Sequence, residues 1–332
     1  MLKEHFRNIL LKKDFDDVLG QELVKRQLKS ALLMGRNTII VGPPGVGKTT
    51  LAKNVAKLLP DMEVNDCEYH CDPSNPLCPE CKAQKQKTKK ITGSQRFIRI
   101  QGSPDLTVED LLGDIDPVKA LKFGPMSIEA FTPGKIFKAN NGVLFFDEVN
   151  RCPERLQNAL LQVLQEKKAT IGSYSVDLPA NFIFIGTMNP DDSSTEKLSD
   201  VFLDRFDLLY MNYPETLKIE KEIIRINGES ITEFPENLLD FAISFIRDFR
   251  DDDKIEKKPS VRASIGLYER AQSNAFLRNS NKVERVDIDN AIISVLNHRI
   301  KLKPSAKYLK KTEQYIREKL EKSVEEKEGD VP

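Results

Sequence analysis

The segment that begins at Gly42 contains residue types that bind a chain of phosphates. Gly47, Lys48 and Thr49 complete the pattern G-x-x-x-x-G-K-T, with a β-branched run before it and a helical pattern after it. Glycines let backbone N–H groups converge on phosphates, the lysine reaches the terminal phosphates, and the threonine hydroxyl binds magnesium. A glycine-rich turn that matches by chance is the alternative. We therefore predict a Mg-ATP site formed by Gly42, Pro43, Pro44, Gly45, Val46, Gly47, Lys48, Thr49 and Thr50.

Two adjacent carboxylates, Asp147 and Glu148, follow the apolar run at 143–146. An acidic pair at the end of a strand can hold magnesium, in part through water, and can polarise the water that attacks a phosphate. We predict the magnesium role for Asp147 and the role of general base for Glu148. The alternative is a pair that only solvates a strand end. The phosphate loop upstream favours phosphoryl transfer.

Four cysteines lie close together in a proline-containing stretch, at Cys67, Cys71, Cys78 and Cys81. Four thiolates at this spacing can surround one tetrahedral ion, and zinc is the first choice. An iron–sulfur cluster uses the same four ligands, and free or disulfide-bonded cysteines are the alternative without a metal. We interpret Cys152, outside this group, as a small buried residue.

Five short apolar runs bounded by turn residues predict the strands that position these groups. They cover residues 38–41, 97–100, 143–146, 182–185 and 208–211. Helical patterns lie between several of them, for example at 21–34 and 153–166. This order predicts a layered α/β domain in which helices cover a parallel five-stranded sheet.

Strand signals fade after residue 213, where we place a domain boundary. The first domain, 1–213, carries a cysteine-rich insertion at 60–96. Residues 214–304 predict a smaller all-helical domain, and residues 305–332 a charged C-terminal helix or tail. A weak apolar stripe in that tail is expected from Tyr308, Tyr315, Ile316 and Leu320.

The bulk composition limits the partners. With 51 basic and 51 acidic residues the net charge is zero, which argues against nonspecific binding to nucleic acid. The sequence shows neither a bilayer-spanning run nor the apolar stretch of a secretion signal, so we expect no membrane contact and a cytoplasmic location. The basic run at 82–90 is expected to be a solvated loop, with an anionic partner as the alternative.

Together with two further polar residues, these motifs resemble the AAA+ ATPases over nearly the whole chain. The further residues are Asn189 in the segment G-T-M-N-P and Arg205 in the segment L-D-R-F. The resemblance implies that Asn189 senses the γ-phosphate and that Arg205 reaches the nucleotide of a neighbouring subunit as an arginine finger. An ordinary ion pair of Arg205 with Asp204 or Asp207 is the alternative. The family implies an ATP-hydrolysing homo-oligomeric ring, expected to be a hexamer.

Within the AAA+ proteins, the chain resembles the I subunit of magnesium chelatase and the MoxR-type ATPases. The resemblance rests on an insertion in the second core helix at about 113–135, a hairpin at about 168–179, and the lid segment P-S-V-R-A-S. It implies that Arg262 in the lid contacts phosphate as a second sensor. The segment F-D-D-V-L-G-Q resembles one that lines the adenine pocket, which suggests Val18 and Leu19 as contacts of the base.

This resemblance implies a motor that uses ATP to remodel a partner or to drive metal insertion into a tetrapyrrole or protein. Chelatase motors work with a subunit that bears an integrin-type domain, so we expect such a subunit or a protein client as the partner. The alternatives are a MoxR-type chaperone or nucleotide-switched binding module, and a DNA-remodelling ATPase. The zero net charge ranks the DNA-remodelling alternative last.

Overall fold

The chain divides into two units that each have a core of their own. In the computed structural model the first unit comprises residues 1–42 and 47–211, and the second comprises residues 43–46 and 212–332. The structure describes residues 2–84, 86–124, 127–171, 174–190 and 198–328. Across these residues, no helix is both long enough and apolar enough to cross a membrane.

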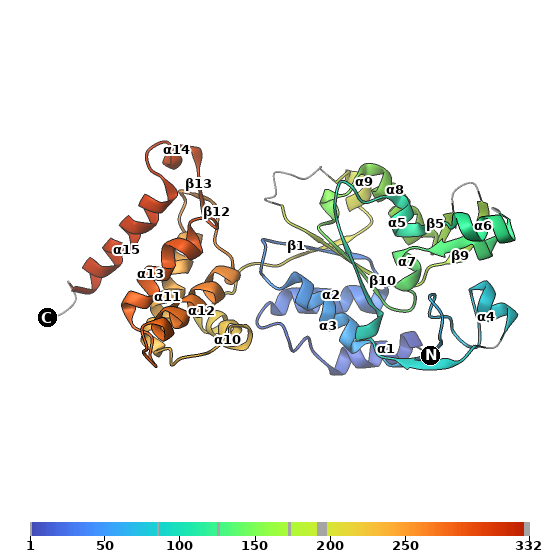
Figure 1. Cartoon of the computed structure of the whole chain (residues 1–332), viewed down its shortest axis with the longest axis horizontal. Helices are drawn as coiled ribbons and strands as arrows, with labels where there is room; N and C mark the ends of the chain where they lie inside the picture. The colour runs from blue at the N-terminus through green and yellow to red at the C-terminus, as the bar shows by residue number, and fades with distance from the viewer. Residues whose placement is uncertain (1, 85, 125–126, 172–173, 191–197, 329–332) are drawn as a thin grey trace. The chain divides into compact units, whose positions relative to one another are not determined.

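A parallel sheet in the order β11-β1-β10-β7-β4 forms the centre of the first unit (Figure 1). Its strands are β1 (Thr38–Val41), β4 (Phe97–Gln101), β7 (Val143–Asp147), β10 (Ile183–Met188) and β11 (Asp207–Tyr210). Every residue of β1 is buried, as expected for a parallel strand that is covered on both faces. The predicted α/β fold with a five-stranded parallel sheet is confirmed, and each predicted run overlaps an observed strand.

Helices cover both faces of this sheet, with α2 and α3 on one face and α8 on the other (Figure 1). Their apolar residues recur at helical spacing, for example Leu51 and Val55 in α3 and Leu156 and Leu160 in α8, all of them buried. The helices and 3-10 turns of the sheet layers are α1 (Leu2–Lys12), α2 (Glu22–Met34), α3 (Lys48–Leu58), η1 (Ser94–Arg96), α5 (Val108–Leu112), α7 (Lys135–Lys138), η3 (Val149–Arg151), α8 (Glu154–Glu166) and α9 (Asp200–Leu203).

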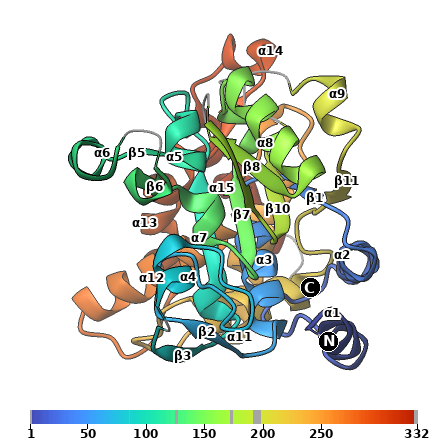
Figure 2. The ribbon, with the colours of Figure 1, turned by 90° about the vertical axis from the view of Figure 1, so that its right-hand side faces the viewer.

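Three antiparallel strand pairs branch from these layers in the described part of the first unit. The cysteine-rich loop, with α4 (Pro79–Ala83), lies between β2 (Met62–Asn65) and β3 (Thr88–Ile91). The second pair is β5 (Gly113–Ile115) with β6 (Phe131–Pro133), and α6 (Pro117–Phe123) and η2 (Ile128–Ala130) lie between these strands in the sequence. This pair lies at the periphery of the unit in the views of Figure 1 and Figure 2. The third pair is β8 (Lys168–Ile171) with β9 (Tyr174–Pro179), and residues 172–173 between them lie outside the described residues.

The second unit is built from helices, with one small sheet of β12 (Ile255–Lys257) and β13 (Lys301–Leu302). Its helices are α10 (Leu217–Asn227), α11 (Glu236–Arg250), α12 (Val261–Leu277), α13 (Arg285–Leu296), α14 (Pro304–Lys307) and α15 (Thr312–Glu328). Leu267 and Ala271 of α12 pack with Ile288 and Ile292 of α13, and all four are fully buried. This unit therefore has an apolar core of its own.

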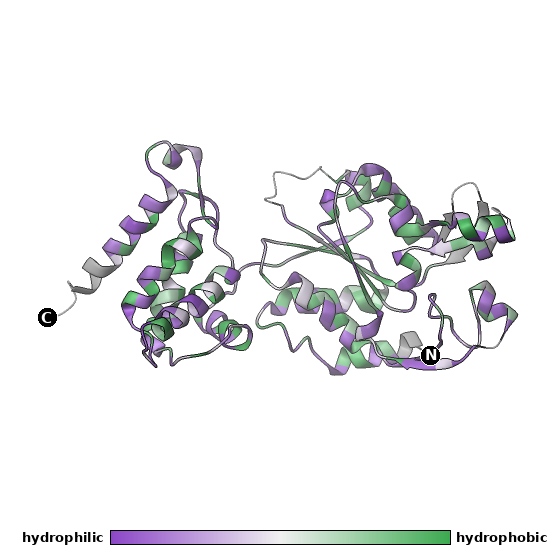
Figure 3. Cartoon of the chain, in the orientation of Figure 1, coloured by the Kyte–Doolittle hydropathy of each residue, from purple (hydrophilic) through white to green (hydrophobic). Residues whose placement is uncertain are grey.

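The last helix, α15, is hydrophilic along most of its length (Figure 3). It packs on the core of the second unit through Ile316, which is fully buried, and through the partly buried Tyr315 and Leu320. The prediction that Tyr308 belongs to the same stripe is wrong, because its side chain is 93% exposed. Tyr308 lies in the turn between α14 and α15, where the helical spacing is interrupted.

Candidate nucleotide-binding site and cysteine cluster

The loop between β1 and α3 has a backbone that glycine adopts most easily. Gly45 and Gly47 have φ angles of 76° and 97°, in the left-handed region. At Gly42 an added Cβ would lie 2.3 Å from the carbonyl oxygen of Met211, so this position has no room for a side chain. The loop ends where α3 begins at Lys48, whose Nζ donates a hydrogen bond to the carbonyl of Gly42. The start of α3 therefore has the backbone form of a phosphate-binding helix N-terminus.

The carboxyl ends of three neighbouring strands bring the predicted residues to one edge of the sheet. The last paired positions are Val41 with Met188, between β1 and β10, and Gly186 with Phe146, between β10 and β7. Asp147 is the last residue of β7, and Gly42, Glu148 and Asn189 directly follow β1, β7 and β10. Because parallel strands end at a common edge, Gly42 at the start of the phosphate loop, the acidic pair and Asn189 lie at the same edge of the sheet.

Asp147 is held in place by two side chains from neighbouring strands. The hydroxyl of Thr187 on β10 donates to Oδ1 of Asp147 at 2.6 Å. The guanidinium of Arg99 on β4 donates to Oδ2 at 2.5 Å. The Asp147 side chain is only 13% exposed, whereas that of Arg99 is 52% exposed. The carboxylate is therefore oriented, and one of its two oxygens faces an exposed cation that a bound ion could replace.

Glu148 lies directly after β7 with a left-handed backbone, φ 56°. Its backbone N–H donates to the Thr187 hydroxyl at 3.0 Å, so one threonine contacts both acidic residues. Its Oε2 accepts a hydrogen bond from Gln101 at 2.8 Å and lies 3.3 Å from Nε of Arg151. These contacts fix the direction of the Glu148 carboxylate.

Asn189 follows β10 and is partly buried. Its carbonyl accepts a hydrogen bond from Nδ2 of Asn150 at 3.4 Å, which connects it to the turn after the acidic pair. Oδ1 of Asn150 is buried without a hydrogen-bond partner among the described residues. This contact holds the segment after β10 beside the segment after β7.

Arg205 is held by its own chain at the end of α9. Its guanidinium donates to the carbonyl of Val201, and Nε lies 2.6 Å from the Gln165 side-chain oxygen when that amide is turned to accept. Asp207 instead forms an ion pair with Arg36 at 2.7 Å. The alternative of an Arg205–Asp207 pair is therefore not what the structure shows.

The other residues expected at the nucleotide are distributed over both units. Val18 is buried and Leu19 is partly buried in the segment before α2, and Asp17 beside them contacts Asn54 of α3. In the second unit, Arg262 is exposed in the first turn of α12. The structure brings Val18 and Leu19 near the helix that carries the phosphate loop.

The donors and acceptors at this edge match the chemistry of Mg-ATP. The first turn of α3 and Lys48 supply positive charge and N–H donors for phosphates. Thr49 in the same turn and Asp147 at the end of β7 supply the oxygen ligands that magnesium prefers. The residues that are present therefore fit the ligand that the sequence predicts.

Three residues that orient the acidic pair were not predicted from the sequence: Thr187, Arg99 and Gln101. Thr187 lies on β10 two residues before Asn189, and the other two lie on β4, where Gln101 is paired in register with Asp147. The sequence does show that these residues lie near the carboxyl ends of two predicted strands. It does not show which strands lie next to β7, because that depends on the strand order of the folded sheet.

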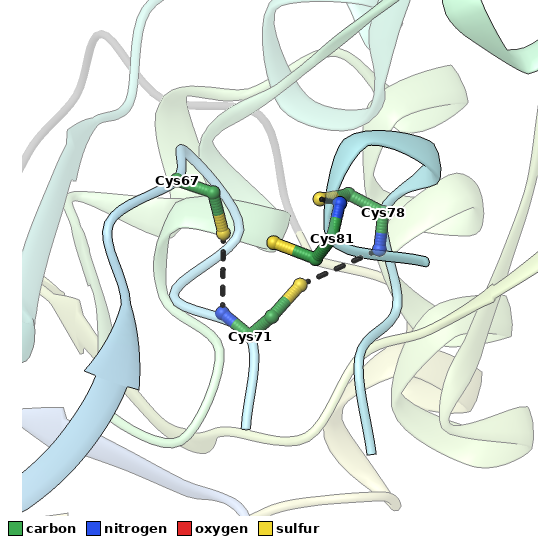
Figure 4. A group of neighbouring side chains, drawn as sticks. All are labelled: Cys67, Cys71, Cys78 and Cys81. Carbon is green, nitrogen blue, oxygen red and sulfur yellow. Dashed lines mark hydrogen bonds between the residues drawn. The ribbon is translucent and has the colours of Figure 1, made fainter. Parts of the chain in front are cut away.

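The four clustered cysteines converge on one point between β2 and β3 (Figure 4). Their Sγ atoms all lie within 4.8 Å of one another. The backbone N–H of Cys71 donates to Sγ of Cys67, and that of Cys78 donates to Sγ of Cys71, both at 3.4 Å. None of the four forms a disulfide. The four sulfur atoms are close enough together to act as ligands of one metal ion.

The cysteine loop packs on the core of the first unit. Tyr69, between the first two cysteines, is buried, and its ring centre lies 6.0 Å from that of Phe137 in α7. Nδ2 of Asn140 donates to the Tyr69 carbonyl at 3.5 Å. Burial raises the pKa of the Cys71 thiol to about 11, and of Cys78 and Cys81 likewise. A bound cation would favour the thiolate forms against this effect.

Two lysines of the basic run after the cysteines pair with acidic residues at the surface. Lys89 contacts Asp66 at 2.5 Å and Lys90 contacts Asp61 at 3.2 Å. Both lysines are on the exposed strand β3, and Lys85 lies outside the described residues. The expectation of a solvated loop is therefore wrong in part, because Lys82 lies in α4 and Lys89 and Lys90 lie in β3, although both of these strand residues are exposed.

Three family models match separate stretches of the chain. The model described as "ATPase family associated with various cellular activities (AAA)" matches residues 78–208. "Magnesium chelatase, subunit ChlI" matches residues 14–89, and "AAA lid domain" matches residues 249–319. Combined with the fold and the site, these matches show that the chain belongs to the AAA+ ATPases.

Curated relatives specify the resemblance within this class. The magnesium-chelatase subunit ChlI homolog of Methanocaldococcus jannaschii is 29% identical, over 94% of this chain and 90% of that protein. The chloroplastic magnesium-chelatase subunit ChlI-2 of Arabidopsis thaliana is 28% identical, over 87% of this chain and 76% of that protein. The chain is thus an AAA+ ATPase that resembles the I subunit of magnesium chelatase.

A solved structure supports the fold. A chain in the structure of the complex between subunits BchI and BchD of magnesium chelatase matches 91% of this chain and 98% of its own length. The two chains are 21% identical, with a TM-score of 0.50. At this identity the likeness supports the architecture of the chain alone.

Proposed function

We propose that the residues at the carboxyl edge of the sheet divide the work of ATP hydrolysis. Lys48 and the N–H groups of the phosphate loop bind the terminal phosphates, and Thr49 and Asp147 hold magnesium. The observation that carries this proposal is the arrival of the loop and the acidic pair at one edge, through the register of β1, β10 and β7. Val18 and Leu19 pack on the adenine base.

In the hydrolysis step, Glu148 accepts the proton of the attacking water. Gln101 holds one carboxylate oxygen of Glu148 at 2.8 Å, which leaves the other to face the water. Magnesium, when bound, neutralises charge on the phosphates. Asn189 and Arg262 contact the phosphate that is cleaved, and thereby stabilise the charge that develops on it.

We infer that Arg205 acts on the nucleotide of a neighbouring copy, so that the chain works as a homo-oligomeric ring, a hexamer. Membership of the AAA+ ATPases supports the ring. The contacts of Arg205 with Val201 and Gln165 fix the guanidinium at the end of α9. A cation supplied from a second copy would neutralise charge on the transferred phosphoryl group.

Mixing two inactive variants tests the shared site. Lys48→Ala removes nucleotide binding and Arg205→Ala removes the trans cation, which is expected to lower turnover about 10³-fold. Mixed rings contain sites with an intact loop from one copy and an intact arginine from another, so part of the turnover returns. A mixture of Lys48→Ala with Asp147→Asn is the control and stays inactive, because both changes damage the same half. Full turnover of Arg205→Ala alone, or no recovery on mixing, contradicts the shared site.

We propose that the ring uses ATP to drive metal insertion, or to remodel a protein, together with a second subunit that bears an integrin-type domain. The support is the resemblance to magnesium-chelatase subunits along 94% of this chain. Affinity capture with Glu148→Gln in the presence of ATP tests it, because this variant holds the nucleotide-bound state. Recovery of only the chain itself, with wild type and variant alike, contradicts a partner.

We propose that Cys67, Cys71, Cys78 and Cys81 hold one zinc ion, in a cytoplasmic and therefore reducing environment. Zinc–sulfur bonds of about 2.3 Å in a tetrahedron place the sulfurs about 3.8 Å apart. The sulfurs already lie within 4.8 Å of one another, so little rearrangement is required. The ion would fix Tyr69 against Phe137 and so attach the loop to the core.

Metal analysis of purified chain tests this site. One zinc per chain is expected, lost in Cys78→Ser and retained in Cys152→Ser, which removes a buried thiol outside the cluster. Replacement with cobalt should give the visible absorption of a tetrahedral thiolate site. Bound iron with sulfide identifies a cluster and overturns zinc. A chain free of metal, from cells grown with zinc and purified without chelators, overturns the site.

A further inference from the structure

A buried ion-pair cluster joins three helices of the second unit. The carboxylate of Glu220 on α10 accepts hydrogen bonds from Nη1 and Nη2 of Arg250 on α11, both at 2.7 Å. The hydroxyl of Ser264 on α12 donates to the same carboxylate at 2.5 Å. Glu220 is fully buried and Arg250 is 5% exposed. Burying these charges costs hydration free energy that apolar side chains of the same volume would not lose, so stability alone does not account for the cluster.

The cluster fixes the chain where α12 begins. Nε of Arg250 donates to the carbonyl of Pro259 at 2.8 Å, and its Nη2 donates to the Ser264 hydroxyl at 3.3 Å. Pro259 comes directly before Ser260, the N-cap residue of α12, and Ser264 ends the first turn. One planar guanidinium thus holds the first turn on both sides. Arg262 lies between these two contacts.

The same carboxylate is connected to residues 214–215, which come directly before α10 and its N-cap residue Thr216. Nη1 of Arg247 lies 3.3 Å from Glu220 and donates to the carbonyl of Pro214 at 2.9 Å. Its Nη2 donates to the carbonyl of Glu215 at 3.0 Å. Residues 214–215 and the first turn of α12 are therefore held by one network.

We propose that Glu220, Arg250 and Ser264 are positioning residues for Arg262. They fix the direction in which the first turn of α12 presents the Arg262 side chain, and they do not contact the nucleotide. This inference rests on the proposed contact of Arg262 with phosphate. An apolar cluster of the same volume would pack α10, α11 and α12 but would not bind the Pro259 carbonyl, which is why charged residues are needed here.

A double-mutant cycle on ATP hydrolysis tests the inference. Ser264→Ala removes one hydroxyl, and we expect the KM for ATP to rise about tenfold through the loosened Arg262. In the Arg262→Ala background the same change should leave KM unaltered, because the residue it positions is gone. Gln272→Ala is the control. It removes a buried side chain of α12 that accepts a hydrogen bond from the Ile231 N–H at 2.9 Å, about three helical turns from Arg262. It should lower the thermal midpoint with no effect on KM.

The outcomes separate this inference from the role of Arg262 itself. If Arg262→Ala does not change KM, the phosphate contact is wrong and the positioning role falls with it. If Arg262→Ala raises KM but Ser264→Ala adds the same factor in both backgrounds, only the positioning role is wrong. Arg250→Lys, which keeps the charge but loses the planar fork, should raise KM as Ser264→Ala does. Wild-type KM in Arg250→Lys also contradicts the inference.

Discussion

Two carboxylate–guanidinium pairs, one in each unit, differ in their exposure to water. The Asp147 side chain is 13% exposed and that of Arg99 is 52% exposed. Glu220 is fully buried and Arg250 is 5% exposed. The first pair lies at the edge of a sheet beside the phosphate loop, whereas the second lies between three helices. The first pair is therefore partly open to water, whereas the second is almost completely shielded from it.

Because of this difference, Asp147 can exchange Arg99 for another cation, whereas Glu220 cannot exchange Arg250. An exposed ion pair contributes little to stability, because water and salt compete for both charges. Breaking a buried pair leaves an uncompensated charge, which costs several kcal/mol. We therefore assign chemistry to the first pair and geometry to the second. The following predictions test this division.

The largest effect is expected for Glu148→Gln. The amide cannot accept the proton of the attacking water, so turnover should fall about 10²- to 10⁴-fold while Mg-ATP still binds. Phosphate release at saturating ATP measures the first effect and equilibrium binding the second. Glu154→Gln, at an exposed position in α8, is the matched control and should retain turnover. Turnover of Glu148→Gln near that of wild type would show that another base acts.

Arg250→Ala should lower the free energy of unfolding of the second unit by about 3–5 kcal/mol, because Glu220 loses its main partner in a buried place. Arg99→Ala should lower the stability of the first unit by less than about 1 kcal/mol, since Arg99 is half exposed and Asp147 keeps its hydrogen bond from Thr187. Urea unfolding followed with a probe in each unit measures both. Equal losses for the two variants would remove the contrast between the pairs.

The buried pair should also make stability depend on pH. Burial raises the pKa of Glu220, but hydrogen bonds from Arg250 and Ser264 and the charge of Arg247 outweigh it and hold the pKa below its ordinary value. The stabilisation is therefore present above that ordinary value, about 4.5, and is lost as the pH falls through the folded pKa. The thermal midpoint of the second unit should drop at acidic pH, and less steeply in Glu220→Gln. Parallel pH curves for variant and wild type would assign the acid sensitivity to other groups.

The smallest effect is expected from the exposed pair. Arg99 donates to Oδ2 of Asp147 at 2.5 Å, and Asp147 is the residue that we propose holds magnesium. Removing this competing charge in Arg99→Ala should lower the magnesium concentration for half-maximal turnover by about twofold to fivefold. A magnesium titration of turnover measures it. A weaker magnesium response in the variant would show that Arg99 assists the ion instead of competing with it.

Much of the first unit could be predicted from the sequence because its signals are local. The β-branched run before Gly42, the glycines with positive φ, and the acidic pair after an apolar run each define their structure within a few residues. The parallel order of the sheet then places these segments together. The convergence of four cysteines was predictable for the same reason, since all four lie within one loop.

The partners of the site residues could not be predicted, because they depend on which strands and helices become neighbours. Thr187 contacts Asp147 only because β10 lies between β1 and β7. Glu220 and Arg250 are 30 residues apart on two helices, and sequence alone gives Glu220 no reason to be buried. The prediction that Tyr308 belongs to the apolar stripe was wrong for a local reason. The chain makes a turn after α14, and this turn interrupts an apolar pattern that looks continuous in the sequence.

Equilibrium binding of ATP, with and without magnesium, tests the proposed assignment most directly when wild type is compared with Lys48→Ala and Asp147→Asn. We expect wild type to bind ATP more tightly with magnesium, Lys48→Ala to lose binding, and Asp147→Asn to bind ATP without the gain from magnesium. Undiminished binding by Lys48→Ala, or an undiminished gain from magnesium in Asp147→Asn, would place the nucleotide elsewhere.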